Sequence, residues 1–271
     1  MEREPAVAGR FYPSDPADLA REVRAFLAPD PGAGRAPAPA RPALGVLSPH
    51  AGYLYSGAVA GATFARVEVP DRVVVLCPNH TGAGERVAAW PGGSWRTPLG
   101  AVPVDGEMTR EIVEAGLATP DRLAHLREHS LEVELPFLQA RNPGVSIAAL
   151  CLGRLPFDRC REIGEGLARV ARRRGALVVA SSDMSHYLPA PVAREKDRMA
   201  IERMLALDAR GLHEVVTREG ISMCGFVPAT VLLVAAVAQG AREAELVRYA
   251  SSGDVTGDQD SVVGYAGLVL S

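Results

Sequence analysis

Short runs of branched apolar residues recur along this chain, separated by longer segments in which apolar and polar positions alternate. The run Val73-Val74-Val75-Leu76 is apolar at every position, as is typical of a strand buried on both faces of a sheet. We predict six strands on this basis, at residues 43–47, 73–77, 146–152, 176–180, 246–250 and 262–270.

Helical periodicity fills most of the intervals between these strands. Within residues 15–27, Leu19, Val23 and Phe26 recur on one face of a helix. We predict further helices at residues 58–66, 105–115, 131–139, 157–173, 191–207 and 226–238. Strands that alternate with helices indicate an α/β fold with a largely parallel central sheet flanked by helices.

One domain accounts for the whole chain, residues 1–271. The segment 28–42 is rich in proline and alanine, which disfavours a helix or a central strand. Because only 27 residues precede it, too few for a domain, we expect a surface loop there and not a linker between domains.

Composition narrows the classes of function. The 29 basic and 32 acidic side chains give a net charge of −3, without the basic stripe of a protein that binds nucleic acid or anionic membrane. Lys196 is the only lysine and lies in no Schiff-base or phosphate-loop motif. The N-terminus lacks the apolar run of a signal peptide, and we expect a cytoplasmic protein.

Reactive side chains gather where the predicted strands end. His50 and His80 follow the first two strands by a few residues, and Asp183 and His186 follow the strand at 176–180. Because ligands bind outside the carboxyl ends of the strands in open α/β sheets, we expect these four side chains at one edge of the sheet.

Cys224 and His129 lie in two further polar motifs. Cys224 directly precedes the helix predicted at 226–238, at or near its N-cap, where the helix dipole favours a thiolate that could bind metal or act as a nucleophile. His129 lies in Glu128-His129-Ser130-Leu131-Glu132. A helix start with Ser130 as cap and with Glu132 and Glu134 in the first turn explains these carboxylates but not the histidine.

Taken together, these motifs resemble those of the Memo-like proteins, called AmmeMemoRadiSam system protein B in prokaryotes. The resemblance spans nearly the whole chain in order. It runs through Ala6-Val7-Ala8-Gly9-Arg10-Phe11-Tyr12-Pro13, Pro49-His50-Ala51-Gly52-Tyr53, Pro78-Asn79-His80, Glu128-His129-Ser130-Leu131-Glu132, Ser181-Ser182-Asp183-Met184-Ser185-His186, Cys224-Gly225, Tyr249-Ala250-Ser251-Ser252-Gly253-Asp254 and Val263-Gly264-Tyr265-Ala266-Gly267.

The resemblance implies a fold similar to that of the class III extradiol dioxygenases of LigB type, which hold non-haem Fe(II) with two histidines and a carboxylate. Memo-like proteins keep the histidines and place a cysteine third, which implies His50, His80 and Cys224 as ligands here. Asp183 and His186 would line the same pocket. Two nitrogens and a sulfur suit Fe(II) or copper, and also zinc, better than magnesium or calcium.

The leading hypothesis is therefore a metal-binding, dioxygenase-like protein with redox or oxygen chemistry and an unknown substrate. Asp183 and His186 are the expected catalytic acid–base groups. Tyr53 and His129 are expected to contact the substrate, which is a small molecule or a peptide. The resemblance also implies a radical-SAM protein and an AMMECR-domain protein as partners.

Two alternatives stay open at this point. One is a non-catalytic module that uses the cleft to hold a metal or a partner. The other is a metal-free hydrolase, with Cys224 as nucleophile and His186 oriented by Asp183. The hydrolase leaves His50 and His80 without a role.

Overall fold

Four parallel strands form the middle of a nine-stranded sheet in the computed structural model, which describes residues 1–28 and 39–271. In spatial order these strands are β2 (Gly45–Ser48), β9 (Leu177–Ser181), β3 (Arg72–Pro78) and β8 (Ser146–Leu152). The predicted α/β class with a helix-flanked sheet is confirmed. The architecture is consistent with the extradiol dioxygenase-like fold that the resemblance implies.

The outer strands make the sheet mixed, where the sequence favoured a largely parallel one. β12 (Val262–Leu270) is antiparallel to β2, and both β11 (Ala244–Ser251) and β10 (His186–Leu188) are antiparallel to β12. At the other edge, β4 (Val87–Ala89) is antiparallel to β8 and parallel to β7 (Thr119–Pro120). The apolar pattern did not reveal this because a buried strand has the same composition in either orientation.

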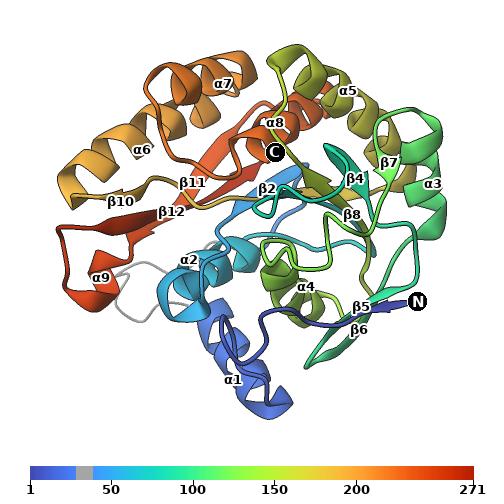
Figure 1. Ribbon diagram of the computed structural model, residues 1–271, viewed down its shortest axis with the longest axis horizontal. Coiled ribbons are helices and arrows are strands. Elements are labelled where there is room, and N and C mark those ends of the chain that lie inside the picture. The colour runs from blue at the N-terminus through green and yellow to red at the C-terminus, as the bar shows by residue number, and fades with distance from the viewer. Residues whose placement is uncertain (29–38) are drawn as a thin grey trace.

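Two layers of helices cover the sheet (Figure 1). One face packs against helices mostly from the second half of the chain, and the other against helices from the first half and from the middle. The first layer contains α5 (Phe157–Arg174), α6 (Ala190–Leu205), α7 (Ala209–Arg218) and α8 (Phe226–Gln239), with α3 (Gly106–Glu114) beside α5. The second contains α1 (Pro16–Leu27), α2 (Tyr53–Ala65) and α4 (Leu135–Arg141).

β3 shows how the sheet separates two apolar cores. Val74 and Leu76 belong to the core under α5 and α8, whereas Val73, Val75 and Cys77 belong to the core under α1, α2 and α4. Side chains alternate between the two faces of a strand, so a run that is apolar at every position serves both cores at once. The sheet is thus buried on both sides and forms a rigid base for the loops at its edge.

Several smaller elements were not predicted. A second sheet joins β1 (Glu2–Arg3), β5 (Ser94–Thr97) and β6 (Gly100–Pro103), and short helices form at η1 (Glu132–Glu134) and α9 (Gly253–Thr256). The helix predicted at 131–139 begins only at Leu135, after η1. The helix α7 was missed, and α2 begins at Tyr53, five residues before the predicted start at 58.

The predicted surface loop at 28–42 lies largely outside the described residues, since residues 29–38 are not among them. Of the remainder, Arg41 forms an isolated bridge with Val67. Among the helices that the structure describes, none combines the length and the apolar character needed to cross a bilayer.

Candidate metal centre

Three neighbouring parallel strands each place a polar side chain two residues beyond the strand end. His50 follows β2, Asp183 follows β9 and His80 follows β3. Because β9 lies between β2 and β3 in the sheet, the three side chains meet at one edge. This is the arrangement that the strand-end argument predicted.

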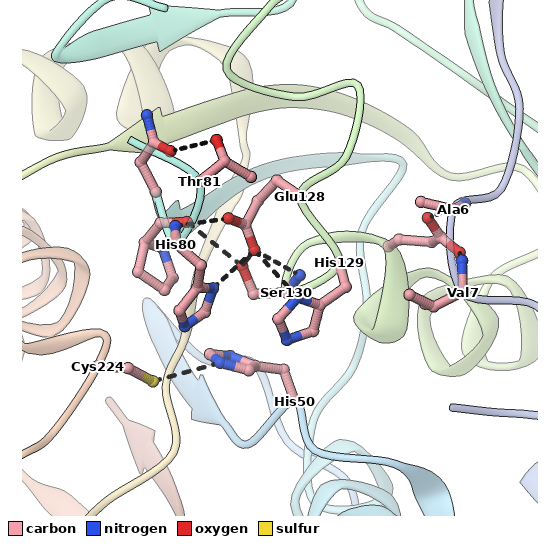
Figure 2. A network of polar contacts seen from close by, with 12 residues as sticks. Ala6, Val7, His50, His80, Thr81, Glu128, His129, Ser130 and Cys224 are labelled. Atoms are coloured by element: carbon pink, nitrogen blue, oxygen red, sulfur yellow. Dashed lines mark hydrogen bonds and ion pairs between the residues drawn. The ribbon is translucent and has the colours of Figure 1, made fainter. Parts of the chain in front are cut away.

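Cys224 reaches the same edge from a different part of the chain. It lies one residue before Gly225, the N-cap of α8, close to the predicted position. Its Sγ atom is 3.3 Å from Nε2 of His50 and accepts a hydrogen bond from the backbone N–H of Asp183 at 3.3 Å. Figure 2 shows the cysteine beside His50, with the rings of His80 and His129 close to that histidine.

Ligand atoms of His50, His80 and Cys224 all lie within 4.8 Å of one another. The structure thus brings the three expected ligands together as a possible metal-binding group. His50 is fully buried and 33 % of the His80 side chain is exposed. A partly open position of this kind is what a metal site needs if a substrate is to reach the metal.

Hydrogen bonds on the far side of each imidazole fix the orientation of both rings. His50 Nδ1 lies 2.7 Å from Ser181 Oγ, and that hydroxyl lies 2.8 Å from Glu134 Oε1. His80 Nδ1 lies 2.8 Å from Glu128 Oε1. Nδ1 is thus engaged on both rings, and Nε2 is the nitrogen left to bind a metal ion, as is usual for a histidine ligand. On His50 this nitrogen faces Cys224 Sγ.

The charge state of His50 fits this role. Burial, followed by the nearby rings of His129 and His80, lowers the pKa of His50 well below its ordinary value. The ring is thus neutral at pH 7, with Nε2 able to bind a metal.

Glu128 has the opposite effect on His80. Burial lowers the pKa of His80, but the hydrogen bond and the charge of Glu128 raise it more, so the net shift is upward. Burial alone would raise the pKa of Glu128. The contacts with His80 and Ser130 outweigh burial and lower this pKa to about 2. The carboxylate of Glu128 is therefore ionised throughout the physiological range.

The expected effect of the helix dipole on Cys224 is wrong. Burial, followed by the charge of Asp183, raises the pKa of the Cys224 thiol, and the hydrogen bonds from backbone groups lower it less. The neighbouring carboxylate and the loss of solvent therefore outweigh the helix end. A thiol in this state needs a nearby cation before it ionises.

His186 lies at the start of β10, and its Nδ1 is 2.9 Å from the carbonyl oxygen of Ser222. Only a protonated Nδ1 can make this contact, so Nε2 is the nitrogen that can accept a proton. Asp183 Oδ1 accepts a hydrogen bond from the backbone N–H of His50 at 2.8 Å. Burial raises the pKa of Asp183.

Of the two residues expected to contact substrate, only His129 lies at the site. Its ring stacks on that of His80 with 4.8 Å between centroids and packs edge-on against His50. Tyr53 is 1 % exposed and donates its hydroxyl to the carbonyl of Val133 at 2.8 Å. A side chain buried in this way offers no surface to a substrate, and we do not include Tyr53 in the site.

Glu128, Ser181 and Glu134 support the histidines but were not singled out from the sequence. The sequence favours Glu132 and Glu134 as first-turn residues of a helix that Ser130 caps. In the structure Ser130 instead donates its hydroxyl to Glu128 Oε1 at 2.7 Å, and η1 has no side-chain cap. The signal that could have indicated Glu128 is its place directly before His129, in the same motif as a site histidine.

Comparison with known proteins gives similarity over the full length of the chain. The sequence profile of a family described as Memo-like protein matches residues 3–269. A MEMO1 family protein of Methanopyrus kandleri is 44 % identical over 280 residues, covering 100 % of this chain and 99 % of its own. One of Aquifex aeolicus is 42 % identical over 270 residues, covering 99 % and 98 %.

A similar fold is found in a crystal structure of an uncharacterized protein of Escherichia coli K12. The TM-score is 0.57 at 15 % sequence identity, over 83 % of this chain and 98 % of that one. At this identity the similarity concerns the fold alone.

Proposed function

Since this chain belongs to the Memo-like protein family, we propose that it is a metal-dependent protein that carries out redox or oxygen chemistry on a small molecule. His50, His80 and Cys224 hold the metal ion in this proposal. The main support for this proposal is that the ligand atoms of the three residues all lie within 4.8 Å of one another.

The donor set limits the metal. Two imidazole nitrogens and a thiolate suit iron, copper or zinc, whereas magnesium and calcium prefer oxygen ligands. The three residues also fit a metal ion, because the contacts at Nδ1 of His50 and His80 leave Nε2 as the donor atom of each ring, and Nε2 of His50 already lies 3.3 Å from Cys224 Sγ. Bound iron or copper would supply one-electron redox chemistry, and zinc would supply Lewis acidity.

The other side chains act on protons and on orientation. In this proposal, His186 accepts or donates a proton at Nε2, since Nδ1 is bonded to the carbonyl of Ser222. Asp183 fixes the loop after β2 through the backbone N–H of His50. His129 stacks on the ring of His80 and holds it from one side.

The hydrolase alternative is not supported by the contacts. Cys224 Sγ lies beside Nε2 of His50, and His186 is bonded to Ser222 and not aligned by Asp183. A Cys224 nucleophile would also need a lowered pKa, and burial raises it.

Elemental analysis of anaerobically purified protein tests the metal centre. We expect near-stoichiometric iron or copper in the wild type and its loss in both His50→Ala and Cys224→Ser. His213→Ala and Cys160→Ala are matched controls, because they remove the same side chains from helices outside the cluster. Absence of metal from all variants, even after reconstitution with Fe(II), Cu(I) and Zn(II), would favour the binding-module alternative.

Oxygen consumption by the loaded wild type then tests the redox chemistry. The radical-SAM protein and the AMMECR-domain protein implied by the resemblance are proposed partners, and co-purification with the tagged chain tests them.

A further inference from the structure

A cavity of about 480 Å³ opens beside His80 and Cys224. It lies between the loops that follow β3 and β8 and the segment that joins α7 to α8. The volume falls in the range of sites for small organic ligands, about 300–1,000 Å³. Because two of the three proposed metal ligands line it, a molecule in the cavity would lie next to the metal.

Most of the cavity wall is apolar. The aliphatic and aromatic part comes from β8, α7, the segment between α7 and α8, and the start of α8, with the side chains of Leu152, Val216, Ile221, Met223, Phe226 and Val227. Neither His129 nor Tyr53 is among the described residues that line it. The cavity thus offers a hydrophobic surface that sequence reasoning did not identify.

Besides His80, one acidic or basic side chain lines the cavity among the residues described there, and its positive charge favours an anion. Arg154, in the loop after β8, is the only arginine that lines the cavity, and no aspartate or glutamate does so among the residues described there. No hydrogen bond or ion pair joins the Arg154 guanidinium to the described part of the chain. About half of the other arginines have carboxylate partners, as Arg66 and Arg174 illustrate.

An unpartnered guanidinium beside an apolar wall has a clear preference among ligands. Its planar array of N–H donors matches a carboxylate or a phosphate group with two parallel hydrogen bonds. The uncapped start of α8, which lies on the same wall, adds positive potential. The apolar surface would cover the rest of the ligand.

We propose that this cavity binds an organic anion, with its carboxylate or phosphate group on Arg154 and its apolar body against the α8 wall, next to His80 and Cys224. The inference rests on the proposed function in one respect: it treats the bound anion as the molecule on which the metal centre acts. Binding of the anion by Arg154 itself does not need the metal.

Ligand-observed NMR titrations of chelator-treated protein test the proposal without interference from a metal. The probes are benzoate, phenyl phosphate and the neutral benzamide, which has nearly the shape of benzoate. The variants are Arg154→Gln and, as a matched control, Arg169→Gln, which removes an exposed arginine on α5 outside the cavity.

We expect benzoate or phenyl phosphate to bind at least about tenfold more tightly than benzamide, as one charge-assisted hydrogen-bond pair provides. Arg154→Gln should remove this difference, and Arg169→Gln should retain it. The tighter of the two anions identifies the group as carboxylate or phosphate.

Equal binding of benzoate and benzamide, equal affinities in wild type and Arg154→Gln, or no binding of any probe would each overturn the proposal. Metal content of Arg154→Gln, measured in parallel, separates the two questions. An intact metal site with no anion preference refutes only the anion site, whereas an anion preference without metal binding refutes only the proposed function.

Discussion

Glu128 accepts two hydrogen bonds from His80, one from ring Nδ1 at 2.8 Å and one from the backbone N–H at 2.7 Å. The carboxylate itself is fully buried. It thus fixes both the ring and the backbone of a proposed metal ligand, although it lies 48 residues away in sequence. Glu128 is a positioning residue for His80 in this structure.

Replacing Glu128 with Gln should therefore weaken metal binding. The amide has one acceptor oxygen for two donors of His80, and its NH₂ group faces one of them. We expect zinc affinity to fall by about 10- to 100-fold, the usual effect of removing a partner of a histidine ligand. Competition with a chromophoric chelator measures this affinity.

Glu114→Gln is the control for that experiment, because Glu114 is exposed at the end of α3. Unchanged zinc affinity in Glu128→Gln would show that Glu128 does not position the ligand.

Gly225→Ala should disturb Cys224 through a steric clash. A Cβ atom at residue 225 would lie 2.3 Å from the carbonyl oxygen of Ser181 and 2.5 Å from Cβ of Ser182. We expect a loss of about 1–3 kcal/mol in the free energy of unfolding, as for other overpacked sites, together with weaker metal retention. Gly106→Ala is the matched control, since no atom lies within 4 Å of its added Cβ. Equal chemical-denaturation midpoints for the two variants would contradict this prediction.

Glu134 should make the stability of the protein depend on pH. Burial raises the pKa of this carboxyl from 4.5 to about 8 in the folded protein. The unfolded chain therefore ionises first, and the folded state loses stability as pH rises from 4.5 to about 8. The slope for one proton is at most about 1.4 kcal/mol per pH unit.

Glu134→Gln should flatten that part of the profile, because the amide does not ionise. The measurement is urea unfolding of both proteins between pH 5 and pH 8, a window that lies within the two pKa values. Parallel profiles for the wild type and the variant would rule out a neutral buried Glu134.

Arg3→Gln should lower the stability of the folded protein, because Arg3 holds the segment that contains Glu128 and Glu132. The Arg3 guanidinium bonds Glu132 at 2.6 Å and the carbonyl oxygens of His125 and Glu128, and both members of the ion pair are buried. Removal of one partner from a buried pair costs about 3–5 kcal/mol. Thermal unfolding should show a large drop for Arg3→Gln and almost none for Arg96→Gln, which breaks an exposed ion pair with Glu2. Similar melting temperatures for the two variants would refute a structural role of the buried pair.

The sequence predicted the structure best at positions where a single physical requirement decides the outcome. The fully apolar run at Val73–Leu76 can be stable only inside a covered sheet, and it is the centre of β3. The same holds for His50 and His80, since the ends of parallel strands meet at one edge whatever the loops do. These positions could be predicted without knowledge of the tertiary contacts.

Positions that depend on several distant partners could not be predicted. Glu128 and Ser181 have their roles only because the loop after β7, the end of β9 and the two histidines come together in space. Tyr53 follows a site histidine by three residues, but α2 begins at this residue and turns its ring into the core. The spacing of residues along the sequence indicates neither the supporting roles of Glu128 and Ser181 nor the burial of Tyr53.

The two histidines and the cysteine of the proposed centre have separate structural origins. His50 and His80 are attached to the parallel strands, whose spacing is set by the backbone, whereas Cys224 stands on the segment before α8. A substitution at position 224 would therefore alter the softness of the ligand set without moving the histidines. During evolution, replacement of this one residue can change which metal such a scaffold prefers, while the sheet keeps the two histidines in place.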